Sequence, residues 1–118
     1  LLSGYRSFDE QVVLFNRYVR KDGLELAIRY SAPPGQSEHQ TGLCFDVASL
    51  YRTFATTEAG IWLNEHCAEY GFIIRYPENS EDITGYMYEP WHIRYVGEET
   101  AQAIMSQGIT LEEYLGVA

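Results

Sequence analysis

A ten-residue stretch at positions 37–46, Ser-Glu-His-Gln-Thr-Gly-Leu-Cys-Phe-Asp, constrains this chain more than any other part of it. It places two potential metal ligands, His39 and Asp46, seven positions apart across a glycine. A second stretch, Glu-Pro-Trp-His, adds Glu89 and His92. Catalytic zinc sites hold the metal with three protein ligands and leave the fourth position for water, whereas structural sites are closed by four. Two histidines, an aspartate and a free glutamate that can accept a proton from water are therefore the components of a hydrolytic zinc site.

Length and composition limit the chain to one domain and narrow its partners. The 118 residues, 46% of them hydrophobic, suit a single core, and we expect one domain over residues 1–118 that acts as a monomer. Eight basic and 17 acidic residues give a net charge of −9, which argues against nucleic acid or an anionic membrane surface as a partner. Cys44 and Cys67 form neither a disulfide framework nor a CxxC pair. Because the sequence starts at Leu1 without a methionine, we expect an N-terminally truncated domain.

A helix is predicted at the beginning of the chain. Ser7 and Glu10 have the spacing of a capping box, in which each side chain bonds the other residue's backbone N–H. The apolar residues that follow recur at helical spacing and predict one buried stripe: Phe8, Val12, Phe15 and Val19. Gly23 ends this helix near Lys21, and residues 24–30 form a second short one.

Strands are predicted around both motifs. Residues 41–47 alternate, which turns Asp46 and Cys44 to one face and sends an apolar set to the core: Leu43, Phe45 and Val47. Residues 72–74 read as a buried strand, and residues 83–88 and 91–96 as two more.

Three further helices are predicted. The first begins at residues 56–58 and ends at Gly71, with a buried stripe of Ala59, Trp62, Leu63, Cys67 and Tyr70. A second opens at residues 97–99 and runs through Ser106. A capping box of Thr110 and Glu113 opens the short closing helix.

For several polar residues, an ordinary structural role is an alternative to a functional one. Cys44 shares a strand face with Asp46 and is a possible thiolate ligand, although a small buried packing residue is the simpler interpretation. His66 falls in the last turn of a helix, where an imidazolium complements the helix dipole. Taken alone, Arg6 and Gln11 fit a solvated cation and a surface polar residue.

Together, Ser37-x-His39-x-x-Gly42-x-x-x-Asp46 and Glu89-Pro-Trp-His92 resemble the VanY-type D-alanyl-D-alanine carboxypeptidases. Their wider group contains vancomycin-resistance dipeptidases, L,D-carboxypeptidases of DacB type and hedgehog signalling domains. Tyr5-Arg6-Ser7 with Gln11, and residues 71–77, also look like family segments, so the resemblance runs from about residue 4 to residue 97. It implies an α+β domain, a small antiparallel sheet flanked by helices with the hedgehog and D-Ala-D-Ala peptidase-like fold. Cys44 departs from the pattern, which normally has alanine there.

Carried onto this chain, the resemblance implies zinc held by His39, Asp46 and His92, with Glu89 as the general base. It further implies roles in substrate binding, with Arg6 on the scissile carbonyl oxygen and the terminal D-alanine met by Ser37 and Gln11. Tyr76 would line the site.

The resulting hypothesis is a bacterial zinc D,D-carboxypeptidase that removes the last D-alanine of peptidoglycan stem peptides and so reduces vancomycin targets. An L,D-carboxypeptidase, a D,D-dipeptidase and a non-catalytic zinc-stabilised binding module stay open. A binding module has no use for a base such as Glu89, and Glu38, in an extended chain, points away from its neighbours and offers no ammonium partner. We expect an extracytoplasmic location, with anchoring through a preceding segment, and keep a cytoplasmic one as the alternative.

Overall fold

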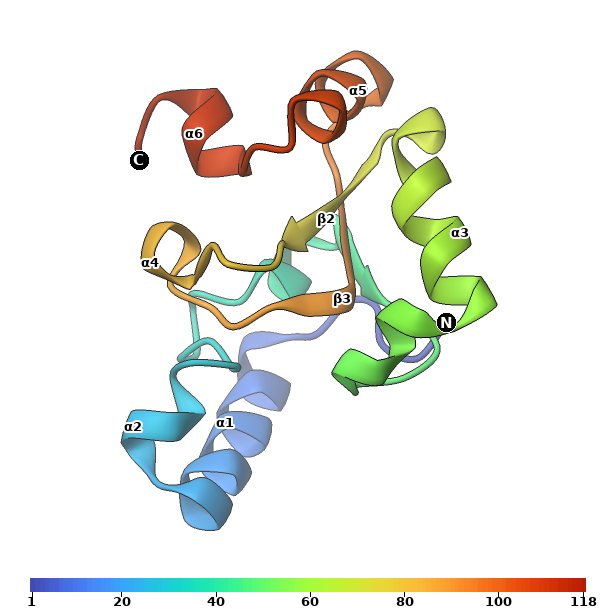
Figure 1. The fold of residues 1–118 in the computed structure, drawn as a ribbon. Coiled ribbons are helices and arrows are strands. Elements are labelled where there is room, and N and C mark those ends of the chain that lie inside the picture. The colour runs from blue at the N-terminus through green and yellow to red at the C-terminus, as the bar shows by residue number, and fades with distance from the viewer.

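A three-stranded antiparallel sheet lies at the centre of the computed structural model, which describes residues 1–118. Its strands follow the order β1 (Cys44–Asp46), β3 (Glu89–Tyr95) and β2 (Phe72–Tyr76). Helices flank the sheet on several sides (Figure 1), with these bounds: α1 Phe8–Asp22, α2 Leu24–Ala27, α3 Glu58–His66, α4 Glu81–Thr84, α5 Glu98–Gln107 and α6 Leu111–Leu115. Three 3-10 helices complete the chain: η1 Glu38–Thr41, η2 Arg52–Thr56 and η3 Cys67–Tyr70. The expected α+β architecture is therefore confirmed.

The register of the sheet brings the two sequence motifs together. On β1 and β3, Asp46 lies directly opposite His92. Between β2 and β3 the register is regular up to Ile74, then shifts so that Tyr76 faces Glu89. Such irregularities re-aim side chains and are frequent beside active sites. The N-terminal residues pair with the outer edge of β1, where Asp46 N donates to Ser3 O at 2.7 Å.

Two hydrophobic clusters fix the two faces of the sheet. Ile74 and Ile93 pack with Cys67 under α3, whereas Ile73 packs on the other face against Ala101 and Ile104 of α5. Side chains alternate along a strand, so His92 points to the face opposite Ile93. The α3 side is therefore apolar, whereas the other face carries both the Ile73 cluster under α5 and the polar residues of β1 and β3.

The capping predictions for the first and last helices are confirmed. Ser7 Oγ accepts from Glu10 N at 3.1 Å, and Glu10 Oε1 accepts from Ser7 N at 3.3 Å. The same reciprocal pair, Thr110 and Glu113, opens α6. Gly23 ends α1 with a φ of 83°, a value that glycine adopts without strain.

The predicted buried stripes of α1 and α3 are wrong in part. Phe8 is 53% exposed, and the buried side of α1 instead centres on Gln11 and Phe15. In α3, Trp62 is 51% exposed because the helix turns Gly60 toward the core. A Cβ at Gly60 would lie 1.9 Å from the carbonyl oxygen of Phe54, so this close backbone contact sets the orientation of the helix. Ala59 and Tyr70 are consequently exposed as well.

Two strand predictions are also corrected. The strand expected over residues 41–47 is only three residues long, because η1 extends to Thr41 and Gly42 then turns the chain at a φ of 74°. Leu43 is exposed as a result, while Phe45 and Val47 reach the core as predicted. The strand expected over residues 83–88 is absent, and the helical turn α4 takes residues 81–84.

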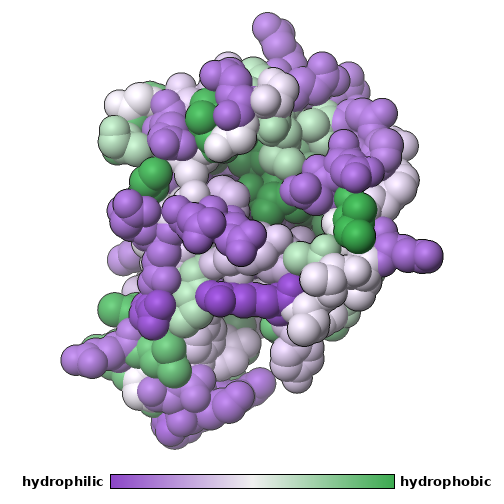
Figure 2. Space-filling view, in the orientation of Figure 1, coloured by the Kyte–Doolittle hydropathy of each residue, from purple (hydrophilic) through white to green (hydrophobic).

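Hydrophilic residues dominate the face seen in Figure 2, and hydrophobic ones gather in a recess beside β2. None of the helices has the length and apolarity that a membrane crossing requires.

Candidate active site

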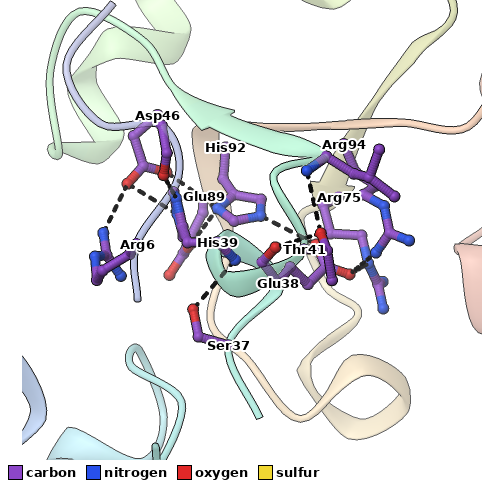
Figure 3. Close-up of polar contacts among 12 residues, drawn as sticks. Arg6, Ser37, Glu38, His39, Thr41, Asp46, Arg75, Glu89, His92 and Arg94 are labelled. Carbon is purple, nitrogen blue, oxygen red and sulfur yellow. Dashed lines mark hydrogen bonds and ion pairs between the residues drawn. The ribbon is translucent and has the colours of Figure 1, made fainter. Parts of the chain in front are cut away.

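The three predicted ligands meet on the face of the sheet opposite α3. His92 Nδ1 lies 3.0 Å from Asp46 Oδ1, and His39 Nε2 lies 3.3 Å from Asp46 Oδ2. Asp46 comes from β1, His92 from β3 and His39 from η1, which crosses in front of them (Figure 3). All three residues are buried. The chain turns at Gly42, and this turn allows His39 and Asp46, seven positions apart, to face each other.

The outer ring nitrogens of both histidines bind groups that only accept hydrogen bonds. His39 Nδ1 lies 2.7 Å from the carbonyl oxygen of Gly4, and His92 Nε2 lies 3.3 Å from Glu38 Oε1. Each outer nitrogen therefore carries the hydrogen, and the inner nitrogens both face Asp46. Metal-binding histidines are typically oriented in this way by a carbonyl or carboxylate on the far side.

The electrostatics of this group of residues favour a cation between them. Burial would raise the pKa of Asp46, but hydrogen bonds from His39 and His92 lower it to about 2. Burial would lower the pKa of His39, but the hydrogen bond to Asp46 raises it to about 9. Two imidazole nitrogens held against an ionised carboxylate require positive charge among them, as protons or as a metal ion. The donor set thus fits Zn²⁺, which binds imidazole nitrogen and carboxylate oxygen.

Cys44 lies closer to this site than its interpretation as a packing residue implies. Its side chain is fully buried on β1, and its sulfur and one nitrogen of each of His39 and His92 all lie within 4.8 Å of one another. Burial raises the pKa of the thiol, yet the hydrogen bonds with the two histidines lower it overall. The structure therefore offers a fourth potential donor beside the predicted three.

Glu89 stands next to the cluster without a strong partner. It is buried at the start of β3, with Oε1 3.7 Å from His92 Nδ1. Burial raises the pKa of Glu89 to about 8, although His92 opposes the effect. A carboxylate beside a cation site that is not itself tied up by donors is suited to take and return a proton.

Arg6 and Gln11 form a unit rather than two independent surface residues. Arg6 Nη1 donates to Gln11 Oε1 at 2.8 Å, and its Nη2 lies 4.0 Å from Asp46 Oδ2. Gln11 is 1% exposed and donates from Nε2 to the carbonyl oxygen of Ala32 at 2.7 Å. The surface interpretation of Gln11 is therefore wrong. Its amide holds Arg6 over the site and ties α1 to the loop that precedes η1.

Ser37 and Tyr76 also reach the site. Ser37 Oγ accepts from His39 N at 3.3 Å as the cap of η1. The Tyr76 ring packs on the His92 ring with centroids 5.0 Å apart, and on Tyr86 at 4.7 Å. His66, as expected, lies elsewhere: it pairs with Glu69 and stacks on Trp62.

A cavity of about 680 Å³ opens over these residues. Arg6, Gln11, Ser37, Glu89 and Tyr76 line it, together with the cluster formed by His39, Asp46 and His92. Its outer walls carry aromatic residues from α1, from the segment after α2 and from the loop after β1: Tyr18, Tyr30 and Tyr51. The volume falls in the range of small-molecule and peptide pockets.

Sequence reasoning missed a charged network behind His92. Glu38 Oε2 accepts from Arg75 Nε and from Arg94 Nη1, both at 2.7 Å. Burial would raise the pKa of Glu38, but the hydrogen bond from His92 and the charge of Arg75 lower it to about 2. Strand alternation was a usable signal, because Arg94 follows His92 by two positions and shares its face. His92 and the two arginines engage both oxygens of the Glu38 carboxylate, so a substrate ammonium group would compete with three donors already in place.

Comparisons with known proteins identify the family of this chain. Residues 1–98 match the family described as VanY: D-alanyl-D-alanine carboxypeptidase. YodJ of Bacillus subtilis (strain 168) is 50% identical over 119 residues, which cover 96% of this chain and 44% of YodJ. The chain thus spans less than half the length of that relative.

Two solved structures are similar throughout the chain. The LD-carboxypeptidase LdcB matches with a TM-score of 0.87 and 48% identity, over 98% of this chain and 57% of LdcB. The vancomycin-resistance D,D-pentapeptidase VanY of the VanB-type cassette was solved as a mutant in complex with Zn(II). It matches with a TM-score of 0.82 and 39% identity, over 96% of this chain and 68% of that one. Because the family match extends over residues 1–98 of the 118, the chain belongs to the VanY family of D-alanyl-D-alanine carboxypeptidases.

Proposed function

We propose that this domain is a zinc-dependent D,D-carboxypeptidase that removes the terminal D-alanine from peptidoglycan stem peptides. The observation that carries the proposal is the convergence of His39, Asp46 and His92 beside the free, buried carboxylate of Glu89. Support also comes from the Zn(II) complex of the related VanY enzyme. When bound, zinc would supply Lewis-acid activation of a water molecule and of the scissile carbonyl.

The residues around the metal ligands divide the remaining work. Glu89 would take the proton of the attacking water and return it to the leaving amine of D-alanine. Its pKa, raised by burial, suits a group that must both accept and donate near neutrality. Arg6 would donate to the carbonyl oxygen as negative charge develops there, held in place by Gln11.

Substrate length follows from the charges that line the cavity. A dipeptidase needs an acidic partner for the free ammonium group of D-Ala-D-Ala. The acidic residues lining the cavity are Glu38, Asp46 and Glu89, and each already has a role as a histidine partner, a ligand or the base. We therefore infer that the substrate has no ammonium group at this place and extends outward, past the tyrosine-lined walls, as a longer stem peptide.

An L,D-carboxypeptidase is the second candidate, because identity to the LD-carboxypeptidase LdcB is 48% and identity to the D,D-pentapeptidase VanY is 39%. The two activities differ in the residue before the scissile bond and share the terminal D-alanine. With the D,D activity, the enzyme would lower the amount of D-Ala-D-Ala ends that vancomycin binds. The expected extracytoplasmic location stays a prediction.

Three parallel digestions test the proposal. A muramyl pentapeptide ending in D-Ala-D-Ala, the tetrapeptide ending in an L,D bond and free D-Ala-D-Ala are each incubated with zinc-loaded protein, and D-alanine release is followed. The pentapeptide should be cleaved fastest. Preferred cleavage of the tetrapeptide would move the assignment to an L,D-carboxypeptidase, and preferred cleavage of the dipeptide to a dipeptidase. Zinc binding without hydrolysis of any of them would indicate a non-catalytic module.

A further inference from the structure

Glu38 lies behind His92, and its two carboxylate oxygens accept hydrogen bonds from different side chains. Oε1 accepts from His92 Nε2 at 3.3 Å. Oε2 accepts from Arg75 and Arg94, both at 2.7 Å (Figure 3). The side chain is only 13% exposed, so water competes little for these bonds. The two arginines therefore decide which oxygen is left for His92.

Arg75 is in turn held from its other side by the closing helix. Its Nη1 and Nη2 donate to Glu112 Oε1 and Oε2, both at 2.8 Å, in a bidentate pair. Glu112 lies on α6, outside the residues that match the VanY family. With the outer fork occupied, only Nε of Arg75 reaches Glu38.

We propose that Glu112 is a positioning residue for the metal centre: through Arg75 and Glu38 it fixes the orientation of His92 and so raises the affinity for zinc. The inference rests on the proposed function only in taking His92 as a zinc ligand. It links the last helix of the chain to a ligand on β3.

Geometry supplies the first reason. A guanidinium prefers to bind a carboxylate with two parallel N–H donors. If Glu112 is removed, the freed fork of Arg75 is able to take both oxygens of Glu38. Oε1 would then leave His92 Nε2, and the imidazole would lose the acceptor that sets its orientation.

Charge supplies the second reason. Glu38 and Glu112 balance Arg75 and Arg94, so the network is neutral as it stands. Loss of the Glu112 charge leaves one positive charge in excess next to His92. Exposed fractions of 19% for the Glu112 side chain and 11% for Arg75 mean that solvent screens this charge only in part. An excess positive charge opposes the binding of a dication at the neighbouring site.

The test is a measurement of zinc affinity by competition with a chromophoric chelator, on the whole chain. Glu38→Gln should weaken zinc binding roughly 10- to 100-fold, the usual effect of removing a ligand's outer partner. Glu112→Gln should weaken it about 2- to 30-fold, the range for coupling through a network. The double variant should lose less affinity than the sum of the two single losses, because the geometric part of the Glu112 effect passes through Glu38.

Glu81→Gln is the matched control. Glu81 forms the same kind of bidentate pair with Arg29, at 2.7 and 2.9 Å, but on the surface. This variant should keep the parental affinity for zinc. Arg75→Lys keeps the positive charge but lacks the guanidinium that joins Glu38 to Glu112, so it should also weaken zinc binding. This variant replaces Glu112→Gln in the test if Glu112→Gln does not fold.

Parental zinc affinity in folded Glu112→Gln, or in Arg75→Lys where the first variant is unfolded, would overturn the inference while leaving the proposed function intact. Additive losses in the double variant would overturn the path through Glu38. A parent protein that hydrolyses stem peptides without binding zinc at His92 would overturn the zinc-dependent function itself and the inference with it.

Discussion

Asp46 and His92 are direct partners across two antiparallel strands, and their side chains meet with Oδ1 and Nδ1 3.0 Å apart. The pairing makes two of the proposed zinc ligands part of the rigid sheet, while the third, His39, approaches from the short helix η1. A site built on strands holds its geometry better than one built on loops. Substitutions at these positions should therefore act on the metal first and on the fold second.

Arg6→Ala should lower the rate of D-alanine release by roughly 10²- to 10³-fold, the cost of removing one donor to a developing oxyanion. Arg6→Lys should recover only part of this loss, because a lysine ammonium lacks the planar fork that binds Gln11 and substrate together. Steady-state kinetics on the stem peptide measure the rates of both variants. Full recovery in the lysine variant would show that charge alone is required.

Gln11→Ala should destabilise the fold by about 1–3 kcal/mol, because it removes a buried side chain and leaves the half-buried carbonyl oxygen of Ala32 without its donor. It should also lower kcat, since Arg6 loses the amide that positions it. Val13→Ala is the control on the same helix: Val13 is 58% exposed, and both stability and rate should change little. Chemical denaturation gives the free energy of unfolding of both variants, and steady-state kinetics gives their kcat. Equal values for Gln11→Ala and Val13→Ala would contradict the buried role of Gln11.

The sequence predicted which residues meet at this site better than it predicted the packing around them. His39, Asp46, Glu89 and His92 were recognisable because few structures other than a metal site require these residue types at this spacing, and capping boxes act over three residues. Gln11 was not recognisable as buried, because its partner, the Ala32 carbonyl, comes from a loop 21 positions away.

The errors in the predicted buried stripe of α3 and in the predicted strands also arise from contacts between residues distant in the sequence or between backbone atoms. The orientation of α3 depends on the close contact of Gly60 with the backbone of Phe54, which side-chain periodicity does not encode. Residues 83–88 contain apolar and aromatic side chains, but α4 takes the first two, Gly85 turns the chain at a φ of 84°, and Met87 N donates to the carbonyl oxygen of Arg29 instead of to a strand. The strand register that joins Asp46 to His92 spans 46 positions and becomes visible only in the fold.

Glu89 should make the stability of the metal-free protein depend on pH. Its pKa is raised from the ordinary value of 4.5 to about 8 in the fold, so burying the ionised form costs stability. This cost is absent below the unfolded pKa and grows as the pH rises, until it is complete above about pH 8. Glu89→Gln, which stays neutral, should equal the parent in thermal stability at about pH 4, below the unfolded pKa, and exceed it increasingly toward about pH 8. A difference that stays constant with pH would contradict the raised pKa.

Cys44→Ala tests which residues hold the metal. If His39, Asp46 and His92 are the ligands, this variant should keep one zinc per chain and a rate within about threefold of the parent, because the lost sulfur contributes packing only. Cobalt substitution gives the clearest measurement, since a cobalt–thiolate bond produces a charge-transfer band. A band in the parent that disappears in Cys44→Ala would show that the thiol is a ligand.

The most direct measurement is zinc content and hydrolysis on the same preparations of the parent and of Glu89→Ala. The parent should carry one zinc, lose hydrolysis of the stem peptide on chelation and regain it when zinc is added back. Glu89→Ala should also carry one zinc but hydrolyse roughly 10²- to 10⁴-fold more slowly, the range for a general acid–base group. Undiminished hydrolysis by the metal-free parent, or a parental rate in Glu89→Ala, would contradict a zinc peptidase in which Glu89 is the base.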